Sequence, residues 1–250
     1  MSMLRELRAV GMAALQFPHA LRRHGCGSAH YVCERNDHYP VLLVHGYAGT
    51  ESVWAPLRRA LAEAGFGHIV SLYYNSFAVD PMAVSAELTR QALRAVAASG
   101  APRVHLIGHS LGGLIVRSAL AASPGLGRRT GGAVTIASPH GGIPLARIAP
   151  GQCARIMHPG HGRTPPEAGA AGPVRWLAYY SDGDRIVPPA SARLDDLGYG
   201  AVNLLIPGCG HLTICHDTRL IGSLVSQLIR TETRTGRVVP DGAGRDLAAA

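Results

Sequence analysis

The chain contains no lysine, and all 24 of its basic residues are arginine. A bias in codon composition accounts for this as well as a functional need does. The arginines are scattered, with no run longer than a pair, and aromatic residues make up only 5% of the chain. Because nucleic-acid-binding surfaces combine clustered basic residues with aromatic side chains, we expect no nucleic-acid partner. The net charge of +8 leaves open a mild attraction to anionic surfaces or substrates.

The chain also lacks a run of about 20 apolar residues, so we predict no membrane span, while peripheral contact with a membrane stays open. Arg5 and Arg8 precede a short apolar run over residues 9–17, which is the outline of a signal peptide. No small-x-small cleavage site follows this run. Apolar residues between 4 and 15 share one helical stripe, which favours a short amphipathic helix. We therefore expect a cytoplasmic protein, with secretion through an atypical signal as the alternative.

No C-x-x-C pair occurs among the five cysteines, which argues against a structural zinc site. Cys26 with Cys33, and Cys209 with Cys215, are close enough in sequence to close small disulfide loops in an exported protein. Free thiols are the alternative reading of the same residues.

Short apolar runs alternate with helical patterns along most of the 250 residues. The alternation predicts an α/β fold, with a mostly parallel sheet of about six strands and helices on both faces. The strands are expected at 40–44, 69–74, 103–107, 132–137, 174–180 and 201–206. The main helices are expected at 52–64, from Asp80 and Pro81 onward, at 114–122 and at 218–229.

These patterns divide the chain into three parts. Residues 1–38 are expected to form an N-terminal extension, 39–231 the α/β domain and 232–250 a loose polar tail. Residues 143–173 are rich in Gly, Pro and His and lack periodicity. We interpret them as a lid-like excursion over the carboxyl edge of the sheet, where reactive groups of such folds gather.

The segment 104–113 (VHLIGHSLGG) is the most informative part of the sequence. Its residues 108–112 form a G-x-S-x-G sequence between a strand pattern and a helical pattern, which is the context that a nucleophilic serine requires. The flanking glycines suit a turn too tight for larger side chains. An ordinary serine in a glycine-rich turn is the alternative, but the context and the partners elsewhere favour Ser110 as a nucleophile.

A nucleophilic serine needs a general base, and the base needs a carboxylate that orients it. The strand at 174–180 is followed by two candidates, Asp182 and Asp184. Asp182 lies in an Asp-Gly turn, where turn formation explains it. Asp184 precedes Val187 and Pro188, which return the chain to packed structure, so we predict Asp184 as the orienting carboxylate.

The base is sought among 13 histidines, and position decides between them. His211 follows the last expected strand directly, within Gly208–His211, as a loop-borne base should. His216 lies five residues later and reads as a solvated loop residue, and His109 lies inside the serine turn, where packing explains it. We therefore predict His211 as the base.

The oxyanion of an acyl-transfer intermediate needs backbone donors. The N–H of Leu111 follows the serine, and the N–H of Tyr47 follows the strand at 40–44. Gly46 allows close approach of the backbone there. A plain turn is the alternative for His45-Gly46, but the preceding strand favours an oxyanion loop.

Five segments together resemble the α/β-hydrolase superfamily, and more narrowly the small bacterial triacylglycerol lipases and esterases. They are residues 40–47 (PVLLVHGY), 108–113 (GHSLGG), 136–142 (IASPHGG), 184–187 (DRIV) and 208–211 (GCGH). The resemblance covers roughly residues 39–230. It gives Ser110, Asp184 and His211 the triad places and Tyr47 and Leu111 the oxyanion places. Unlike secreted members, the chain shows no clear signal peptide, and it has no cluster of acidic residues typical of calcium sites in larger lipases.

The sequence therefore predicts a serine carboxylic-ester hydrolase that acts through an acyl-enzyme on an ester or lipid substrate. It needs neither a metal nor an organic cofactor, and nothing in the sequence indicates an oligomeric state. A thioesterase or acyltransferase acting on a carrier-bound acyl chain is one alternative. A non-catalytic binding module on the same fold is another, which intact Asp184 and His211 disfavour.

Overall fold

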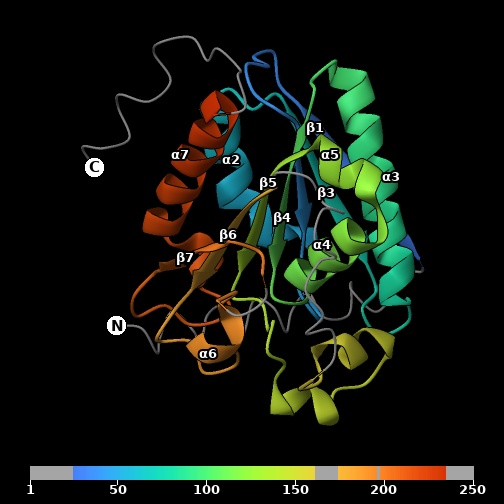
Figure 1. Cartoon of the computed structure of the whole chain (residues 1–250), viewed down its shortest axis with the longest axis vertical. Helices are drawn as coiled ribbons and strands as arrows, with labels where there is room; N and C mark the ends of the chain where they lie inside the picture. Colours follow the sequence, from blue (N-terminus) through green and yellow to red (C-terminus); the bar gives the residue numbers. More distant parts are fainter. Residues whose placement is uncertain (1–24, 161–173, 196–197, 235–250) are drawn as a thin grey trace.

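In the part of the chain that the computed structural model describes (residues 25–160, 174–195 and 198–234), seven strands form one sheet (Figure 1). Their spatial order is β1-β3-β2-β4-β5-β6-β7. Strand β1 runs antiparallel to β3, and the other neighbours are parallel. The strands are β1 (Cys26–Val32), β2 (Val41–Val44), β3 (His68–Tyr74), β4 (Val104–His109), β5 (Thr130–Ile136), β6 (Arg175–Tyr180) and β7 (Val202–Leu205).

The α/β fold with a mostly parallel sheet that the sequence predicts is confirmed, and the six expected strands are present as β2 to β7. The expected start of the domain at residue 39 is corrected, because β1 belongs to the sheet and residues 1–38 are therefore not all an extension outside the domain. This strand lies at the edge of the sheet and is half-buried or exposed along its length. Its sequence therefore lacks the apolar run by which a central strand is recognised. The amphipathic helix expected near the N-terminus lies outside the described residues.

Helices cover both faces of the sheet (Figure 1). Helices α2 and α7 pack on one face, and α3, α4 and α5 lie on the other. Strand β2 shows why its sequence is continuously apolar: Val41 and Leu43 face the first group, whereas Leu42 and Val44 face the second. The helices are α2 (Ala55–Glu63), α3 (Pro81–Ser99), α4 (Leu111–Ala122), α5 (Pro124–Arg129), α6 (Pro189–Ala192) and α7 (Thr218–Arg234). Short 3₁₀ helices are η1 (Glu51–Trp54), η2 (Pro144–Arg147), η3 (Gln152–Met157) and η4 (Ile214–His216).

Helix α3 begins where the sequence predicts. The Asp80 side chain accepts a hydrogen bond of 2.7 Å from the Met82 N–H, and Pro81 occupies the first turn. Helix α7 instead runs past its expected end at Ile229 to Arg234. The expected tail from residue 232 is therefore wrong in its first residues, and residues 235–250 lie outside the described part.

A buried polar cluster explains the longer helix α7. The Glu232 carboxylate has no exposed side-chain surface and accepts hydrogen bonds from His38 Nδ1 (3.0 Å), His105 Nε2 (3.0 Å) and the Tyr39 N–H (2.8 Å). We call Glu232, His38 and His105 the His–Glu–His cluster. His105 lies near the start of β4, so the cluster sits at the amino end of the sheet. From the sequence, an isolated polar residue such as Glu232 is interpreted as part of the tail, because the two histidines that it contacts lie 127 and 194 residues away in the chain.

Residues 143–160 lie at the carboxyl end of the sheet, below it in Figure 1, and include the 3₁₀ helices η2 and η3. Ile143 and Met157 are buried and are joined through the Ile143 N–H and the Met157 carbonyl at 2.9 Å. Leu145 and Ile148 are exposed. The first half of the expected excursion is thus packed on the sheet edge, and residues 161–173 lie outside the described part.

The five cysteines all lie among the described residues and are free thiols, so the two possible disulfide loops are not formed. Of the helices in the described ranges, none is long and apolar enough to cross a membrane.

Candidate active site

Ser110 occupies the sharp turn between β4 and α4. Its backbone has φ 54° and ψ −123°, a strained conformation for a residue with a side chain. A Cβ on Gly108 would lie 2.3 Å from the Gly112 carbonyl, and a Cβ on Gly112 would lie 2.1 Å from the Val44 oxygen. Both positions therefore require glycine, which explains the G-x-S-x-G spacing physically.

The structure brings Ser110, His211 and Asp184 into one line of contacts. His211 Nε2 lies 3.0 Å from Ser110 Oγ, and His211 Nδ1 lies 2.7 Å from Asp184 Oδ2. The three side chains come from the loops after β4, β7 and β6, which all end at the carboxyl edge of the sheet. All three residues are buried. A serine, a histidine and a carboxylate at these distances can pass the serine proton to the imidazole.

Asp184 is held as an ionised carboxylate. Its Oδ1 accepts hydrogen bonds from the N–H groups of Ile186 (2.8 Å) and Val187 (2.9 Å). Burial raises the pKa of Asp184, but the hydrogen bond from His211 and these two backbone donors outweigh burial and lower it overall. The ionised form is the one that fixes an imidazole tautomer.

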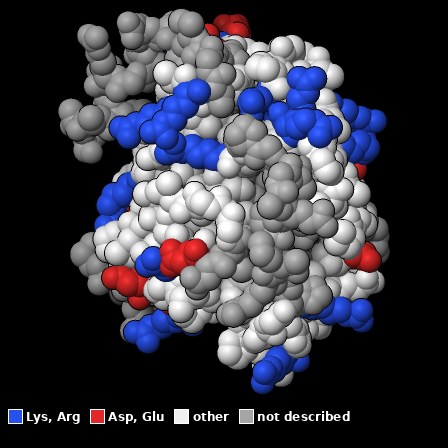
Figure 2. Space-filling view, viewed as in Figure 1, with Lys and Arg blue, Asp and Glu red and all other residues white. Residues whose placement is uncertain are grey.

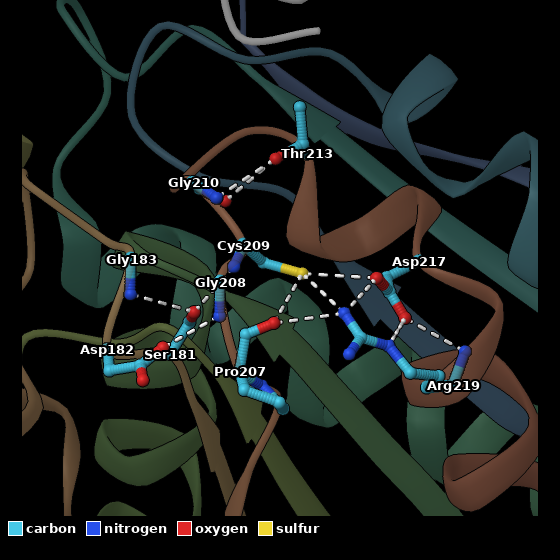
Figure 3. A network of polar contacts seen from close by, with 10 residues as sticks. All are labelled: Ser181, Asp182, Gly183, Pro207, Gly208, Cys209, Gly210, Thr213, Asp217 and Arg219. Atoms are coloured by element: carbon cyan, nitrogen blue, oxygen red, sulfur yellow. Dashed lines mark hydrogen bonds and ion pairs between the residues drawn. The ribbon is translucent and has the colours of Figure 1, made fainter. Parts of the chain in front are cut away.

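Asp182, the competing aspartate, has another role. Its Oδ1 accepts a 2.7 Å hydrogen bond from the Gly208 N–H, and the neighbouring Ser181 Oγ accepts one of 2.9 Å from the Cys209 N–H (Figure 3). These contacts join the loop that carries Asp184 to the loop that carries His211. Asp182 therefore shapes the site without touching His211.

Neither of the other candidate histidines contacts the serine as a base would. His216 is exposed in η4. His109 donates from Nε2 to the His211 carbonyl at 3.0 Å, and burial lowers its pKa to about 3, aided by the nearby imidazole of His211. A neutral His109 thus anchors the backbone of His211, a role that its place inside the serine turn did not indicate.

The Gly46–Tyr47 peptide lies against the serine. A Cβ built on Gly46 would lie 2.9 Å from the Ser110 Cβ. The Gly46 carbonyl accepts hydrogen bonds from His45 Nδ1 (2.9 Å) and the Gly49 N–H (3.2 Å). Because the carbonyl and N–H of a trans peptide point in opposite directions, the Tyr47 N–H points away from these donors.

The imidazole of His45 is itself held. Its Nε2 accepts a 3.3 Å hydrogen bond from the Tyr74 N–H, and the two rings stack at 4.3 Å. The Tyr74 hydroxyl also donates to the His45 carbonyl at 2.7 Å. Sequence reasoning missed both supports, although the position of His45 directly after β2 was the available signal.

Leu111 begins helix α4, and its N–H is among those that have no partner within a helix. The positive end of the helix dipole adds to the attraction of this N–H for negative charge. Leu111 thus lies in α4, whereas Tyr47 lies in the loop after β2.

The segment after β5 lies beside the serine helix. A Cβ on Gly113 would come within 2.0 Å of the Ser138 hydroxyl. His140 is buried between Thr135 Oγ1 (3.0 Å from Nε2) and Arg117 Nη1 (3.2 Å from Nδ1). Burial, with the nearby Arg117 charge, keeps the pKa of His140 well below its usual value. His140 therefore acts as a neutral bridge between β5 and α4.

Within the described ranges, no three His, Cys, Asp or Glu side chains are grouped so that they could hold a metal ion.

Comparison with known proteins identifies the fold. A family profile described as the alpha/beta hydrolase fold matches residues 39–152. The crystal structure of a mature lipase from Bacillus licheniformis superimposes with a TM-score of 0.66 at 17% identity, covering 81% of this chain and 97% of that one. The chain has the α/β-hydrolase fold. Est1E from Butyrivibrio proteoclasticus is similar to this chain in fold, with a TM-score of 0.61 at 16% identity over 84% of this chain and 93% of that one.

Sequence relatives of the chain include bacterial triacylglycerol lipases. Those of Pseudarthrobacter phenanthrenivorans and Burkholderia plantarii are each 34% identical over 116 residues, or 43% of this chain. The match spans about a third of the length of these relatives, 35% and 31% respectively. The similarity to these lipases thus covers less than half of the chain.

Proposed function

We propose that this protein is an α/β hydrolase that cleaves carboxylic esters through an acyl-enzyme on Ser110. The proposal rests above all on the line of contacts from Ser110 Oγ through His211 to Asp184, at 3.0 and 2.7 Å. The similarity to lipases and esterases supports the same class of substrate. His211 is the general base, and Asp184 is the carboxylate that orients it.

In the first half of the reaction, Ser110 Oγ attacks the ester carbonyl carbon while its proton passes to His211 Nε2. The carbonyl oxygen becomes negative and accepts hydrogen bonds from the N–H groups of Leu111 and Tyr47, each worth about 3 kcal/mol of barrier. Asp184 stays ionised and stabilises the imidazolium. When the intermediate collapses, the bond to the alkoxy oxygen breaks, and His211 gives this oxygen the proton, so that a neutral alcohol leaves.

In the second half, a water molecule attacks the acyl carbon of the Ser110 ester. His211 takes a proton from the water, and the same backbone donors hold the new oxyanion. Collapse breaks the bond to Ser110 Oγ, which recovers its proton from His211. The products are a carboxylic acid and the enzyme in its starting state.

The test compares the wild type with Ser110→Ala on a chain-length series of p-nitrophenyl esters. Ser85→Ala is the matched control, because Ser85 is also a buried serine but lies on α3, where its hydroxyl donates to the Pro81 carbonyl. We expect Ser110→Ala to lose ester hydrolysis with an unchanged circular dichroism spectrum, and Ser85→Ala to retain it. Unchanged hydrolysis by purified Ser110→Ala refutes the assignment.

The same preparations separate the alternatives. Acyl-thioesters and emulsified triglycerides are assayed beside the simple esters. Faster turnover of thioesters than of esters assigns the site to carrier-bound acyl chains. A fluorophosphonate probe that labels the wild type but not Ser110→Ala, detected by intact mass, supports a catalytic serine, whereas no labelling favours a binding module.

A further inference from the structure

The loop that carries His211 has little intrinsic rigidity. It runs from Pro207 to His211 and contains two glycines, of which Gly208 has φ +72°. Glycine loses more conformational freedom on folding than other residues, so such a loop needs outside contacts to hold one conformation. A displacement of the base by about 1 Å can cost about a hundredfold in rate.

One side of the loop is held by the turn that carries Asp184, through the contacts of Ser181 and Asp182 described above (Figure 3). The other side is held by the start of α7. Arg219 Nη2 donates to the Pro207 carbonyl at 3.0 Å and lies 3.5 Å from Cys209 Sγ. Figure 3 shows this side of the loop facing Asp217 and Arg219.

Asp217 holds both Arg219 and the cysteine in place. Its two carboxylate oxygens accept from Arg219 Nε (3.0 Å) and Nη2 (2.8 Å), and Oδ2 also accepts from Cys209 Sγ at 3.1 Å. Burial, together with the carboxylate of Asp217, raises the pKa of Cys209 to about 11. The thiol therefore stays protonated at neutral pH and can donate to Asp217.

Building on the function proposed above, we propose that Arg219 and Asp217 are positioning residues for His211. Together they clamp the Pro207–Cys209 backbone from the side opposite Ser181 and Asp182. Neither residue touches the reacting atoms. Their effect is to keep the imidazole at hydrogen-bonding distance from Ser110 Oγ.

An exposed ion pair contributes little to the free energy of unfolding. We therefore expect the role of Arg219 to show in the rate of the reaction. Its side chain is 55% exposed and that of Asp217 is 17% exposed. Arg90 and Glu87 on α3 provide a matched pair at 46% and 14%. Arg90→Gln therefore removes an equivalent charge and ion pair on the face of the sheet that α3 covers.

The experiment measures kcat and KM on a p-nitrophenyl ester for Arg219→Gln, Arg219→Lys and Arg90→Gln. We expect Arg219→Gln to lower kcat about tenfold with KM nearly unchanged, because substrate contacts remain while the base is less well held. Arg219→Lys should recover part of the loss, since one ammonium replaces the forked contacts only partly. Arg90→Gln should match the wild type.

Asp217→Asn provides a second route to the same clamp, because an asparagine oxygen can still accept the 2.9 Å hydrogen bond that Asp217 Oδ1 receives from the Arg219 N–H at the start of α7. We expect its kcat to fall to a similar extent, and the double variant with Arg219→Gln to be no worse than either single variant, as members of one unit behave. Values of kcat for both single variants that equal that of Arg90→Gln overturn the proposal.

Amide hydrogen exchange over residues 207–211 tests the clamp without any substrate. We expect faster exchange in Arg219→Gln than in the wild type or Arg90→Gln. If the wild type hydrolyses no ester, the proposed function fails, and this measurement alone still decides the clamp. Identical exchange in all three proteins refutes it.

Discussion

Glu232→Gln removes the negative charge of the His–Glu–His cluster while keeping the shape of the side chain. Glu232 is wholly buried and accepts three hydrogen bonds, two of them from His38 and His105. Among the described residues, His38 Nε2 and His105 Nδ1 have no hydrogen-bond partner. Each ring therefore best carries its proton on the nitrogen that faces Glu232. In Glu232→Gln, an amide NH₂ group replaces one of the two carboxylate oxygens. This group is a donor where an acceptor stood, and it faces an N–H group with which it cannot form a hydrogen bond.

The size of the effect on stability follows from the change in the pKa of the Glu232 carboxyl group on folding. Burial raises the pKa of Glu232, but the hydrogen bonds from His105, His38 and the backbone outweigh burial and lower it from 4.5 to about 2. Each tenfold change in the acid constant is worth about 1.4 kcal/mol, so the folded state gains about 3 kcal/mol at pH 7. Because the folded pKa is depressed, this stabilisation is present above pH 4.5 and is lost as the pH falls toward 2.

Guanidinium denaturation at pH 7 and pH 3, followed by circular dichroism, measures the effect. We expect Glu232→Gln to unfold about 3 kcal/mol more easily at pH 7, with less than half of this difference left at pH 3. Glu63→Gln, at an exposed ion pair with Arg59, should change stability by no more than about 0.5 kcal/mol. His105 and Ser110 are five residues apart along β4, roughly 16 Å, so the folded variant should keep its ester hydrolysis.

A loss below 1 kcal/mol at pH 7, or a difference that does not shrink at pH 3, would refute this reasoning. The first result would mean that the hydrogen-bond partners of Glu232 do not stabilise its ionised carboxylate more than water does. The second would mean that the stabilisation does not come from the ionised form.

Three further predictions concern the site and are read from kcat on a p-nitrophenyl ester. Asp184→Asn should lower kcat by about 10⁴, because an amide favours the wrong imidazole tautomer, and Asp182→Asn by far less; equal losses would contradict the assignment. Gly46→Ala should lower kcat at least tenfold while the protein stays folded, since the new Cβ would lie 2.9 Å from the Ser110 Cβ. His109→Gln should lower kcat without removing an ionisation between pH 5 and 9, because the pKa of His109 is about 3; a lost ionisation would contradict its neutral state.

Much of the fold could be predicted because its central strands are buried on both faces. Strand β2 is continuously apolar for this reason, and this pattern is local. The edge strand β1 and the last turn of α7 escaped prediction for the opposite reason. Their residues are half-exposed or polar, and only partners distant in the chain hold them in place.

The same distinction applies to the candidate site. Ser110 is marked by glycines that its own turn requires, and Asp184 and His211 follow strands that can be recognised. The supporting contacts of His45 and Arg219 depend on which backbone carbonyl each side chain reaches. Such contacts arise from tertiary packing, and no local pattern marks them.

The position of His211 after the edge strand β7 has a consequence for heat inactivation. Ser110 and His211 are 101 residues apart and meet only while β7 is paired with β6. Strand β7 has four residues and is partly exposed, so it belongs to the part of a fold that opens most easily. We expect activity to disappear on warming before the sheet melts, and to return last on refolding, so that ester turnover reports the docking of a single strand.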